Sequence, residues 1–502
     1  MSLTIRSSFR CVTTIAALLS GASTAWAAAP LTLQEAVGRA LEKNFTVKAA
    51  EYGPQIGKAE LNAAWGRFEP ALEFTYTDGE DASVLSPDPF NPARPANALT
   101  ITDRYTGGVG GILPFGTRYS VGGWSLNQRI PTNAYKDEYY AFGGIEITQP
   151  LLRGFGFGYN LADVRIARTN RAWSEWEYRA ALIDTITDVV LVYQDLNFSI
   201  LNLRAAQRSR DLAQALVSEN TRRVEVGSMS EYDVTAARAY VARREEYVLF
   251  AERAVEEQRN LLRRLISDEK TMALLEEQLE ITTPPPIGRA PESVSADFQK
   301  ALELRPDYRQ SRLNVQRSRH TRDFRANELL PEINFVGSLG YHGYGSTFRE
   351  SRHRVEERDR RSYTAGAVVR IPLTLREGRS NYRAAKLRLR QAETQLDLLE
   401  QAVMVAVANA AGRIETARKR VAATRTAREL AQSVVDAQVK LLRTSTNATS
   451  TFQVLNYQEQ LAGAETAEYR ALADEQQAIA EYDRQIGTTL QTWRVDLDEP
   501  KS

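Results

Sequence analysis

The sequence predicts a mainly α-helical protein with a β-barrel contribution, in which long antiparallel coiled-coil helical hairpins are combined with four or more transmembrane β-strands per chain. Three observations predict this fold class. The chain contains one unit twice, each copy has segments of alternating polarity, and each copy has long stretches with heptad spacing. The 502 residues carry a formal net charge of +1, so charge gives no reason to expect a nucleic acid partner.

The N-terminal segment predicts an export signal. Arg6 and Arg10 precede a mostly apolar run at 12–19, and two A-x-A cleavage motifs follow, so we assign 1–29 to a signal peptide. The run is shorter than the about 20 residues that a helical anchor requires. Cys11, the only cysteine, precedes the run and therefore cannot carry a lipid after cleavage. Because no other stretch could form a membrane helix, any membrane span has to consist of strands.

Two copies of one unit make up most of the chain. Residues 70–74 match 331–335 at an offset of 261 residues, whereas the later prolines match at an offset of 222, so the first copy carries 39 extra residues. The prolines at the predicted strand–helix junctions are Pro70, Pro150, Pro331 and Pro372. The predicted organisation is a first repeat at 30–281, a proline-rich linker at 282–298, a second repeat at 294–487 and a C-terminal tail at 488–502.

Each copy begins with a helix, at about 32–66 and 294–327, followed by segments that alternate in polarity. Residues 72–77, 333–341 and 363–371 place apolar side chains at every second position, and each run is close to the 9–11 residues of a tilted transmembrane strand. Periodicity alone slightly favours an ordinary half-buried sheet. The small number of strands, their aromatic residues and the helices on one side favour the membrane.

Two very long helices are predicted at about 160–225 and 378–443. Each returns through a second helix, at about 230–267 and 450–486. Apolar residues at 182–203 follow a 4-3 spacing, which indicates a coiled-coil seam. A solvated helical bundle or spacer would show the same stripes, and the stripes alone favour it.

Four strands in a membrane leave two open edges, whose backbone groups lipid cannot satisfy. Closing the sheet requires further chains, and three copies are the natural number. An export signal, a mature chain without cysteine and a membrane span made of strands together indicate the outer membrane of a Gram-negative bacterium.

The 39 extra residues include 105–128, in which 114–117 have the composition of a turn between two strands. This pair either forms an extracellular hairpin or joins the barrel and raises the strand number of a trimer to 18. We favour a hairpin that continues beyond the membrane. Residues 86–98 and 346–361 are expected to be external loops, and the second is a run of charges, which is typical of a solvated segment.

Enzymatic chemistry is not expected, because the residues that it needs do not occur in suitable patterns. The three histidines, His320, His342 and His353, have no second ligand at metal spacing. Residues 154–158 alternate Gly and Phe but lack the strand–loop–helix setting of a dinucleotide site. We therefore predict no catalytic residue, no cofactor-binding residue and no metal ligand.

A reversal at 223–239 separates the first pair of long helices. Gly227 allows the chain to leave one helix in a left-handed conformation. Ser230 is placed to cap the next helix, and Asp233 adds negative charge near the N-terminus of that helix. The sequence therefore predicts a tight turn at this tip.

Several motifs resemble those of the TolC-type outer membrane efflux proteins, also called outer membrane factors. "RRVEVGSMSEYDVTAARA" at 222–239 resembles the family's R-x-x-x-G-x-x-S-x-x-D-V-x-x-A-x-A hairpin, and "LTLQEAVGRALEKNFTVKAA" at 31–50 resembles its N-terminal helix. "ITQPLLRGFG", "LLPEINF" and "IPLTLREG" resemble its helix–strand junctions. The resemblance covers nearly the whole mature chain, in both repeats and in order.

The resemblance implies a homotrimer with a 12-stranded barrel in outer membrane lipid and a helical tunnel, or α-barrel, across the periplasm. It also implies docking to a periplasmic adaptor (a membrane fusion protein) and to an inner-membrane pump of the RND or ABC type. The implied function is a passive exit duct for efflux or type I secretion. The positions that it assigns to adaptor contacts at the two helical tips are Gly227, Ser228, Ser230, Thr446 and Asn447.

The resemblance further implies a periplasmic gate, or constriction, at the tips, to which Asp233 also belongs. Well-studied members carry two acids one helical turn apart at the second tip, and the matching residues are Gln453 and Asn456. A Tyr and an Arg that hold the closed state fall on Thr444 and Thr449. We therefore expect a gate that is less cation-selective than a ring of acids and that other contacts hold closed.

Two other classes of protein can be weighed against the duct. A structural trimeric coiled-coil envelope protein without transport would have one uninterrupted rod and no internal duplication, whereas this chain is expected to double back near 227 and 447. A periplasmic enzyme or adaptor would lack paired membrane strands. Drug efflux and protein secretion differ in the partner and not in this chain, and no His- or Met-rich tract indicates heavy-metal cargo.

Overall fold

The structure is a computed structural model that describes residues 30–84, 90, 97–131, 134–288, 291, 293–444 and 451–495. The predicted signal peptide, most of the predicted loop at 86–98 and part of the second tip lie outside these ranges. The chain divides into two compact units. The helical unit comprises Met1–Gly53, Glu175–Gln310 and Asp397–Ser502, and the strand unit comprises Pro54–Ser174 and Ser311–Leu396.

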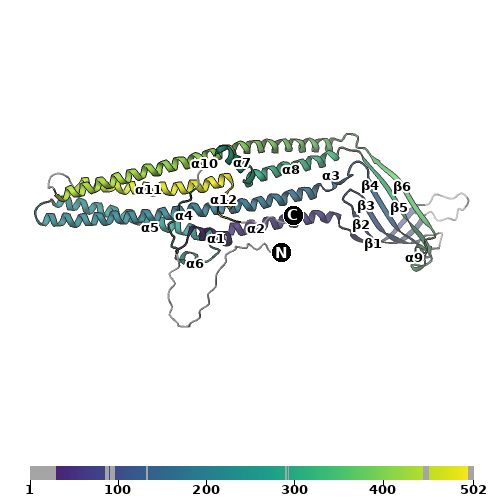
Figure 1. Cartoon of the computed structure of the whole chain (residues 1–502). Coiled ribbons are helices and arrows are strands. Elements are labelled where there is room, and N and C mark those ends of the chain that lie inside the picture. The colour runs from purple at the N-terminus through teal and green to yellow at the C-terminus, as the bar shows by residue number, and fades with distance from the viewer. Residues whose placement is uncertain are drawn as a thin grey trace, which may run out of the picture. The chain divides into compact units, whose positions relative to one another are not determined.

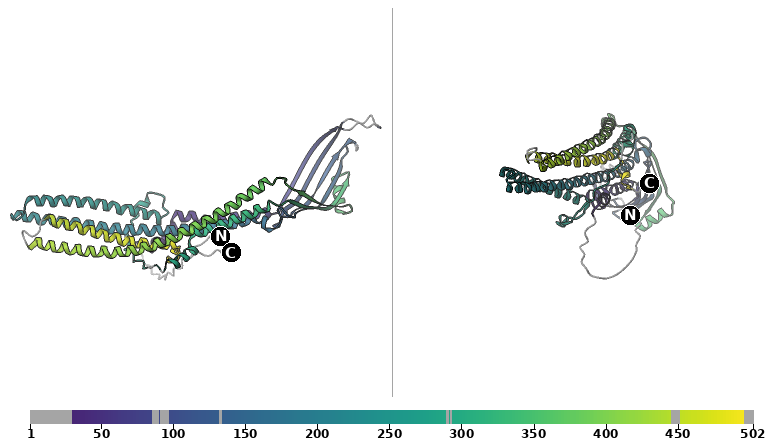
Figure 2. Two further views of the ribbon diagram at one scale, coloured as in Figure 1. Left: turned by 90° about the horizontal axis from the view of Figure 1, so that it is seen from above. Right: turned by 60° about the vertical axis from the view of Figure 1, so that its left-hand side comes forward.

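The helical unit is built on two long antiparallel hairpins, which lie side by side in Figure 1 and in both views of Figure 2. α4 (Ala162–Glu225) reverses into α5 (Glu231–Ile266), and α10 (Arg376–Thr444) is followed by α11 (Thr451–Ile486). Every bound lies within two residues of its predicted position. The other helices in the described part of the chain are α1 (Leu33–Lys43), α2 (Phe45–Trp65), α3 (Phe157–Asn160), α6 (Ala273–Glu276), α7 (Val294–Leu304), α8 (Pro306–Asn327), α9 (Phe348–Glu356) and α12 (Thr489–Thr492), with a short 3-10 turn η1 (Gly66–Phe68). Of these, α3, α9 and η1 belong to the strand unit, and α2 and α8 are divided between the two units.

The predicted coiled-coil seam forms the core of the first hairpin. Ile186, Val189, Tyr193 and Leu196 of α4 are fully buried, as is Leu262 of α5 in the same apolar cluster. Four buried side chains of α1 belong to this cluster, so the N-terminal helix packs onto the hairpin. A second apolar cluster joins α7, α10 and α11 in the same way. The apolar stripes of the long helices are therefore buried by helix–helix packing.

The strand unit contains a six-stranded antiparallel sheet in chain order. Its strands are β1 (Ala71–Val84), β2 (Asn97–Ile112), β3 (Arg118–Arg129), β4 (Glu138–Pro150), β5 (Glu332–Gly345) and β6 (Arg361–Arg370). The predicted first repeat contains β1 to β4 and the predicted second repeat contains β5 and β6, so β4 and β5 pair across the predicted boundary. Within the described residues β1 and β6 have a strand neighbour on one side only, so the sheet has two open edges.

The structure corrects the expectation of a hairpin beyond the membrane. Residues 105–128 belong to β2 and β3, which lie inside the sheet between β1 and β4. The turn at 113–117 lies against the segment that follows β4, where the amide of Gly156 donates a 2.9 Å hydrogen bond to the carbonyl of Phe115. This turn is therefore at the end of β2 opposite Asn97. The insert adds two strands to the sheet rather than a projection from it.

Glycine concealed these two strands in the sequence. Gly108 of β2 and Gly122 of β3 lie opposite each other, and a Cβ on Gly122 would come within 2.3 Å of the carbonyl oxygen of Gly107. The close approach of the two backbones requires glycine at these positions. Glycine is depleted in strands and interrupts the alternation of polar and apolar residues, so the sequence pattern did not reveal a strand here.

The predicted external loop at 346–361 contains a helix, α9 (Phe348–Glu356), which is a second correction. Ser351 of α9 is fully buried. A Cβ on Gly343 of β5 would lie 1.8 Å from the carbonyl oxygen of Ser351, so glycine lets the helix lie directly on the sheet. The segment is thus a helix that packs on β5 through Ser351, while its arginines remain exposed to water.

The register gives the sheet two different faces. The residues of one row across all six strands are Leu72, Val109, Val121, Ile145, Leu339 and Tyr363. The next row, on the other side, is Glu73, Gly108, Gly122, Gly144, Gly340 and Ser362. We call these sides the apolar face and the polar face. Leu72 is 81% exposed and Tyr363 73% exposed, so the apolar face requires a cover other than water.

Candidate functional site

Backbone hydrogen bonds hold the first helical tip in a tight reversal. After the end of α4, the amide of Gly227 donates to the carbonyl of Val224 over 2.9 Å. The amide of Ser228 donates to the carbonyl of Arg223 over 2.8 Å. Gly227 has a φ of +74°, a left-handed conformation that favours glycine. A side chain there would meet open space, so the conformation alone requires glycine.

α5 begins immediately after this turn. Ser230 is its N-cap, and the Ser230 side chain accepts a 3.2 Å hydrogen bond from the amide of Tyr232. Glu231 and Asp233 place two carboxylates in the first turn, where the helix dipole favours negative charge. Asp233 is half-buried, whereas Ser228 and Ser230 are exposed. The first tip thus consists of an exposed turn with two serines, followed by the N-terminus of α5 with two carboxylates.

The second tip is described only in part. α10 ends at Thr444, of which only the backbone is described. Thr446, Asn447 and Thr449, which the sequence assigned to the tip, lie outside the described residues.

Two amide side chains share one face of α11 near its start. Gln453 and Asn456 are three residues apart and both are exposed. Val454 and Leu455 between them are 1% and 6% exposed and belong to an apolar cluster with α4 and α5. Because residues three apart lie on the same side of a helix, the two amides point away from this cluster together.

A polar contact between α5 and α11 joins the two hairpins. The hydroxyl of Tyr240 donates to the carbonyl of Leu455 over 3.3 Å, and the guanidinium of Arg244 donates to the same hydroxyl. Arg244 also lies 4.5 Å from the centre of the Tyr240 ring and 3.6 Å from the Glu459 carboxylate. Tyr240 is 8% exposed and Arg244 7% exposed. We call this contact the Tyr240–Arg244 cluster.

Burial raises the pKa of Tyr240 above its ordinary value, and the positive charge of Arg244 offsets this only in part. The phenol therefore stays protonated at neutral pH and remains a hydrogen-bond donor. The sequence did not point to either residue, since a Tyr and an Arg four positions apart are common on solvated helix faces. Only their burial against the second hairpin distinguishes them.

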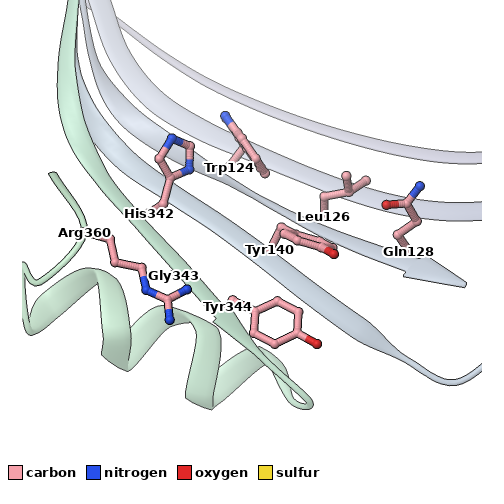
Figure 3. Close-up of a pocket in the computed structure, with 8 residues that line it drawn as sticks. All are labelled: Trp124, Leu126, Gln128, Tyr140, His342, Gly343, Tyr344 and Arg360. Atoms are coloured by element: carbon pink, nitrogen blue, oxygen red, sulfur yellow. The ribbon is translucent and has the colours of Figure 1, made fainter. Parts of the chain in front are cut away.

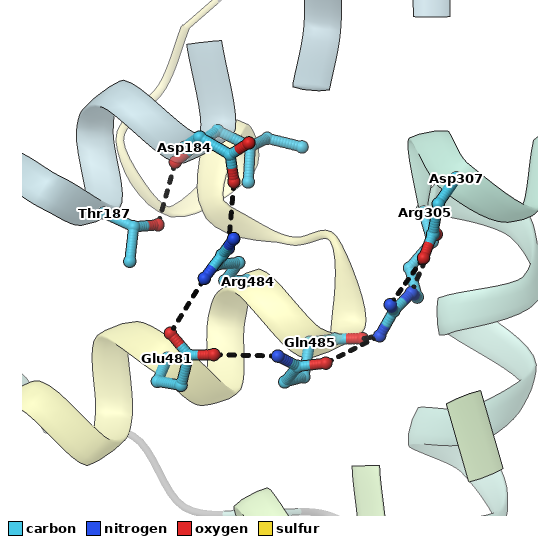
Figure 4. A network of polar contacts seen from close by, with 8 residues as sticks. Asp184, Thr187, Arg305, Asp307, Glu481, Arg484 and Gln485 are labelled. Carbon is cyan, nitrogen blue, oxygen red and sulfur yellow. Dashed lines mark hydrogen bonds and ion pairs between the residues drawn. The ribbon is translucent and has the colours of Figure 1, made fainter. Parts of the chain in front are cut away.

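A second polar network joins the hairpins at the C-terminal end of α11 (Figure 4). Its members are Asp184 of α4, Arg305 and Asp307 at the start of α8, and Glu481, Arg484 and Gln485 of α11. Arg484 donates to Asp184 over 2.9 Å. Arg305 donates to Gln485 over 2.8 Å and pairs with Asp307 at 2.7 Å. The network ties three segments from both repeats together.

The four prolines named from the sequence lie at strand ends. Pro70 and Pro331 immediately precede β1 and β5. Pro150 is the last residue of β4, and Pro372 follows the end of β6 by two residues. Proline cannot donate a ladder hydrogen bond, which fits positions where strand pairing begins or stops.

The histidines lie on three elements, His320 on α8, His342 on β5 and His353 on α9. Among the described residues, no group of three or more His, Cys, Asp or Glu side chains could hold a metal ion. None of the helices in the described part of the chain has the length and apolar character needed to cross a membrane.

Comparisons with known proteins point to one family. A family model described as "Outer membrane efflux protein" matches residues 113–267 and 298–488, which is more than half of the chain. A comparison with curated proteins found no match. Among solved structures, the outer membrane channel CmeC of Campylobacter jejuni is similar, with a TM-score of 0.65 and 15% sequence identity over 91% of this chain and 85% of that chain.

Two further channels show the same likeness. The outer membrane protein VceC of Vibrio cholerae has a TM-score of 0.65 and 15% identity over 91% of this chain and 96% of that chain. The open state of the outer membrane channel MtrE of Neisseria gonorrhoeae has a TM-score of 0.65 and 16% identity over 91% of this chain and 88% of that chain. These likenesses confirm the predicted fold class of long helices with an antiparallel sheet. Since the family match extends over most of both repeats, this chain belongs to the outer membrane efflux protein family.

Proposed function

We propose that three copies of this chain form a passive exit duct in the outer membrane, which receives cargo from a periplasmic adaptor and an inner-membrane pump. One observation carries the proposal, namely a sheet with an exposed apolar face and two open edges. Lipid can cover the apolar face but cannot satisfy the backbone groups of β1 and β6. Antiparallel pairing of β6 in one copy with β1 in the next satisfies both edges.

A trimer closed in this way has 18 strands, because each chain supplies six. The family resemblance implied 12, and β2 and β3 account for the difference. Barrels of 16 to 18 strands leave an aqueous channel. The polar face, with its glycines and its Ser, Thr and Glu side chains, is suited to line such a channel, and the apolar face is suited to lipid.

The helical tips form the periplasmic gate in this proposal. Gln453 and Asn456 replace a ring of acids by a ring of amides, which attracts cations more weakly. Thr444 and Thr449 have neither the aromatic ring nor the charge that hold the closed state in well-studied family members. The Tyr240–Arg244 cluster provides the contact between the hairpins instead. Asp233 adds acidic charge at the first tip. Multivalent cations are expected to block conductance in planar bilayers only weakly, and strong block would contradict this gate.

Adaptor contacts are proposed at both tips. The residues are Gly227, Ser228 and Ser230 of the first tip and Thr446 and Asn447 of the second. Val226 and Tyr232, beside the first turn, are each 77% exposed. An exposed Tyr beside polar groups is a typical anchor of a protein interface. The pump is of the RND type for drug efflux or the ABC type for type I secretion, and this choice lies with the partners.

Cross-linking from the tips tests the proposal. Ser228→Cys and Thr446→Cys each add one thiol to a chain whose own cysteine precedes the predicted cleavage site. In intact Gram-negative cells, both variants are expected to capture a periplasmic adaptor, and the unheated protein is expected to migrate as a trimer. Ser380→Cys, exposed near the opposite end of α10, is the matched control and is expected to capture none. A water-soluble monomer, or equal capture from all three sites, would contradict the duct.

A further inference from the structure

The polar face of the sheet carries a cluster of aromatic side chains (Figure 3). Trp124 of β3, Phe142 of β4 and His342 of β5 lie opposite one another in register. Their ring centres are 5.0 to 6.2 Å apart. In the next row on this face, Tyr140 and Tyr344 form a pair with ring centres 5.3 Å apart. These rings stand on the face that elsewhere presents mainly small and polar side chains.

The aromatic side chains of this cluster do not face the side of the sheet that is suited to lipid, and α9 does not cover them. Successive side chains of a strand point to opposite faces, so the rings project away from the apolar row that contains Val121 and Ile145. α9 lies on the apolar side, because a Cβ on Gly143 would lie 3.1 Å from the side chain of Val355. The aromatic cluster is therefore open on the polar side.

A cavity of about 490 Å³ lies over the cluster. Its walls include Trp124, Leu126, Tyr140, His342, Tyr344 and Arg360. Glycine beside the cluster leaves room for its rings, since a Cβ on Gly340 would lie 2.5 Å from the ring of Phe142. This volume falls within the range of small-molecule sites, and aromatic walls with a few polar groups are typical of them.

The charges around the cavity favour an anion. Arg360 forms part of the wall and makes no ion pair within the described ranges. The guanidinium of Arg104 lies 5.1 Å from the centre of the Trp124 ring. Glu138, on the same face, already accepts hydrogen bonds from the hydroxyls of Tyr140 and Tyr344 at 3.3 and 3.4 Å. The surroundings of the cavity thus contain two guanidinium groups and one carboxylate, and that carboxylate already accepts hydrogen bonds from two tyrosines.

We propose that this cavity binds small aromatic carboxylates. The aromatic ring of the ligand stacks on Trp124 and meets His342, whose ring is inclined by 66° to that of Trp124, with its edge. The carboxylate of the ligand pairs with the guanidinium of Arg360. Ring stacking selects planar ligands, and a charge-assisted hydrogen bond to a guanidinium selects anions. The site adds a cargo class to the proposed duct and rests on that function only for the route by which the ligand arrives.

Equilibrium dialysis of the purified protein in detergent, with radiolabelled 2-naphthoate as the probe, tests the site. Naphthalene-2-carboxamide and 2-naphthylmethylammonium carry the same rings with no charge and with positive charge. Naphthoate is expected to bind roughly tenfold more tightly than either, which is the usual effect of one hydrogen bond to a charged group. Equal binding of the three ligands would overturn the proposal.

Two variants assign the binding to this cavity. Arg360→Gln is expected to weaken naphthoate binding about tenfold and to leave carboxamide binding unchanged, whereas Trp124→Leu is expected to weaken both. Arg118→Gln changes an exposed arginine on the polar face near the other end of β3 and is the matched control. If Trp124→Leu does not fold, Arg360→Gln decides alone, since Arg360 is exposed. Unchanged naphthoate binding in Arg360→Gln would overturn the site.

This test is independent of transport. A protein that binds naphthoate through Arg360 but captures no adaptor from its tips would contradict the proposed duct and leave the binding site intact. A trimer that captures an adaptor but shows no Arg360-dependent binding would overturn the binding site alone.

Discussion

Arg244 shows how a single charged side chain can be accommodated between two coiled-coil hairpins. Burying a charge is costly unless it finds partners. Arg244 has the Tyr240 hydroxyl, the Tyr240 ring and the Glu459 carboxylate within reach. Glu459 is on α11, and Tyr240 also donates to the backbone of α11, so this ion pair and this hydrogen bond exist only while the hairpins stay together. The cluster therefore favours the arrangement in which α5 and α11 are in contact.

Removing the Tyr240 hydroxyl is expected to loosen this contact. Tyr240→Phe deletes the donor to Leu455 and the acceptor of Arg244, at a cost of about 1 kcal/mol for each lost hydrogen bond. The fraction of time that single channels spend open in planar bilayers is expected to rise. Tyr247→Phe keeps a ring 5.5 Å from Arg244 and is expected to leave the open fraction unchanged. If Tyr240→Phe gates like the wild type, the cluster does not hold the closed state.

Asp307 makes the stability of the helical unit depend on pH. Burial alone raises the pKa of Asp307, but hydrogen bonds and the positive charge of Arg305 outweigh burial, so the net pKa lies below its ordinary value. A carboxyl group with a lowered folded-state pKa stabilises the fold above its ordinary pKa of about 3.9. This stabilisation is lost as the pH falls through the lower folded value.

Asp307→Asn is accordingly expected to lower the melting temperature at neutral pH. The difference from the wild type is expected to shrink below about pH 4, where the carboxyl group of the unfolded chain begins to be protonated, and to vanish below the lower folded-state pKa. Circular dichroism melts over a pH series measure both quantities. Asp323→Asn changes an exposed acid on α8 and serves as the control with little expected effect. A constant difference at every pH would argue against the ion pair.

At the scale of elements, the sequence predicted the long helices better than the sheet. The bounds of α4, α5, α10 and α11 were predictable because their apolar residues keep one spacing over many turns. β2 and β3 were placed wrongly because glycines interrupt their alternation. α9 was missed since its charges resemble a solvated loop and only the fold shows that glycines of β4 and β5 leave room for it on the sheet. The reversal of α4 into α5 also argues against a single structural rod.

The seat of α9 on the sheet is expected to depend on glycine. In Gly343→Ala the added methyl group would collide with the backbone of Ser351. α9 is therefore expected to detach and unfold, which lets trypsin cleave at its already exposed arginines. Limited proteolysis followed by mass spectrometry measures cleavage within α9. Gly366→Ala on β6 is the control, because its Cβ would make only an ordinary 3.7 Å contact with Val336. Equal cleavage in the two variants would show that α9 needs no glycine beneath it.

At the scale of the whole molecule, membership of the outer membrane efflux protein family places the chain in the outer membrane as a transporter and not as an enzyme, as the sequence predicted. Fold class and family were predictable because they rest on periodicity and on motifs along the chain. The Tyr240–Arg244 cluster and the aromatic cavity were not, since each brings together residues from separate elements. The boundaries of the two repeats stay a prediction.

A matched pair on β6 tests which face of the sheet meets lipid. Val369 is 57% exposed on the apolar face, and Val368 is 46% exposed on the polar face. Val369→Lys is expected to destabilise the membrane-inserted form by about 2–4 kcal/mol if the residue lies near the bilayer midplane, whereas Val368→Lys is expected to be tolerated. The amount of heat-modifiable trimer in outer membrane fractions measures the effect. Equal loss in both variants would contradict the assignment of the faces.

Because β2 and β3 lie inside the sheet, the strand number of each subunit is independent of the edge strands through which subunits would recognise one another. Both edge strands, β1 and β6, lie outside this hairpin, and β1 and β4 run in opposite directions. Excising the hairpin would let β1 and β4 pair and would leave the intermolecular seams as they are. In the proposed trimer, evolution or an engineer can therefore alter the calibre of the pore by two strands per subunit without changing how subunits recognise one another.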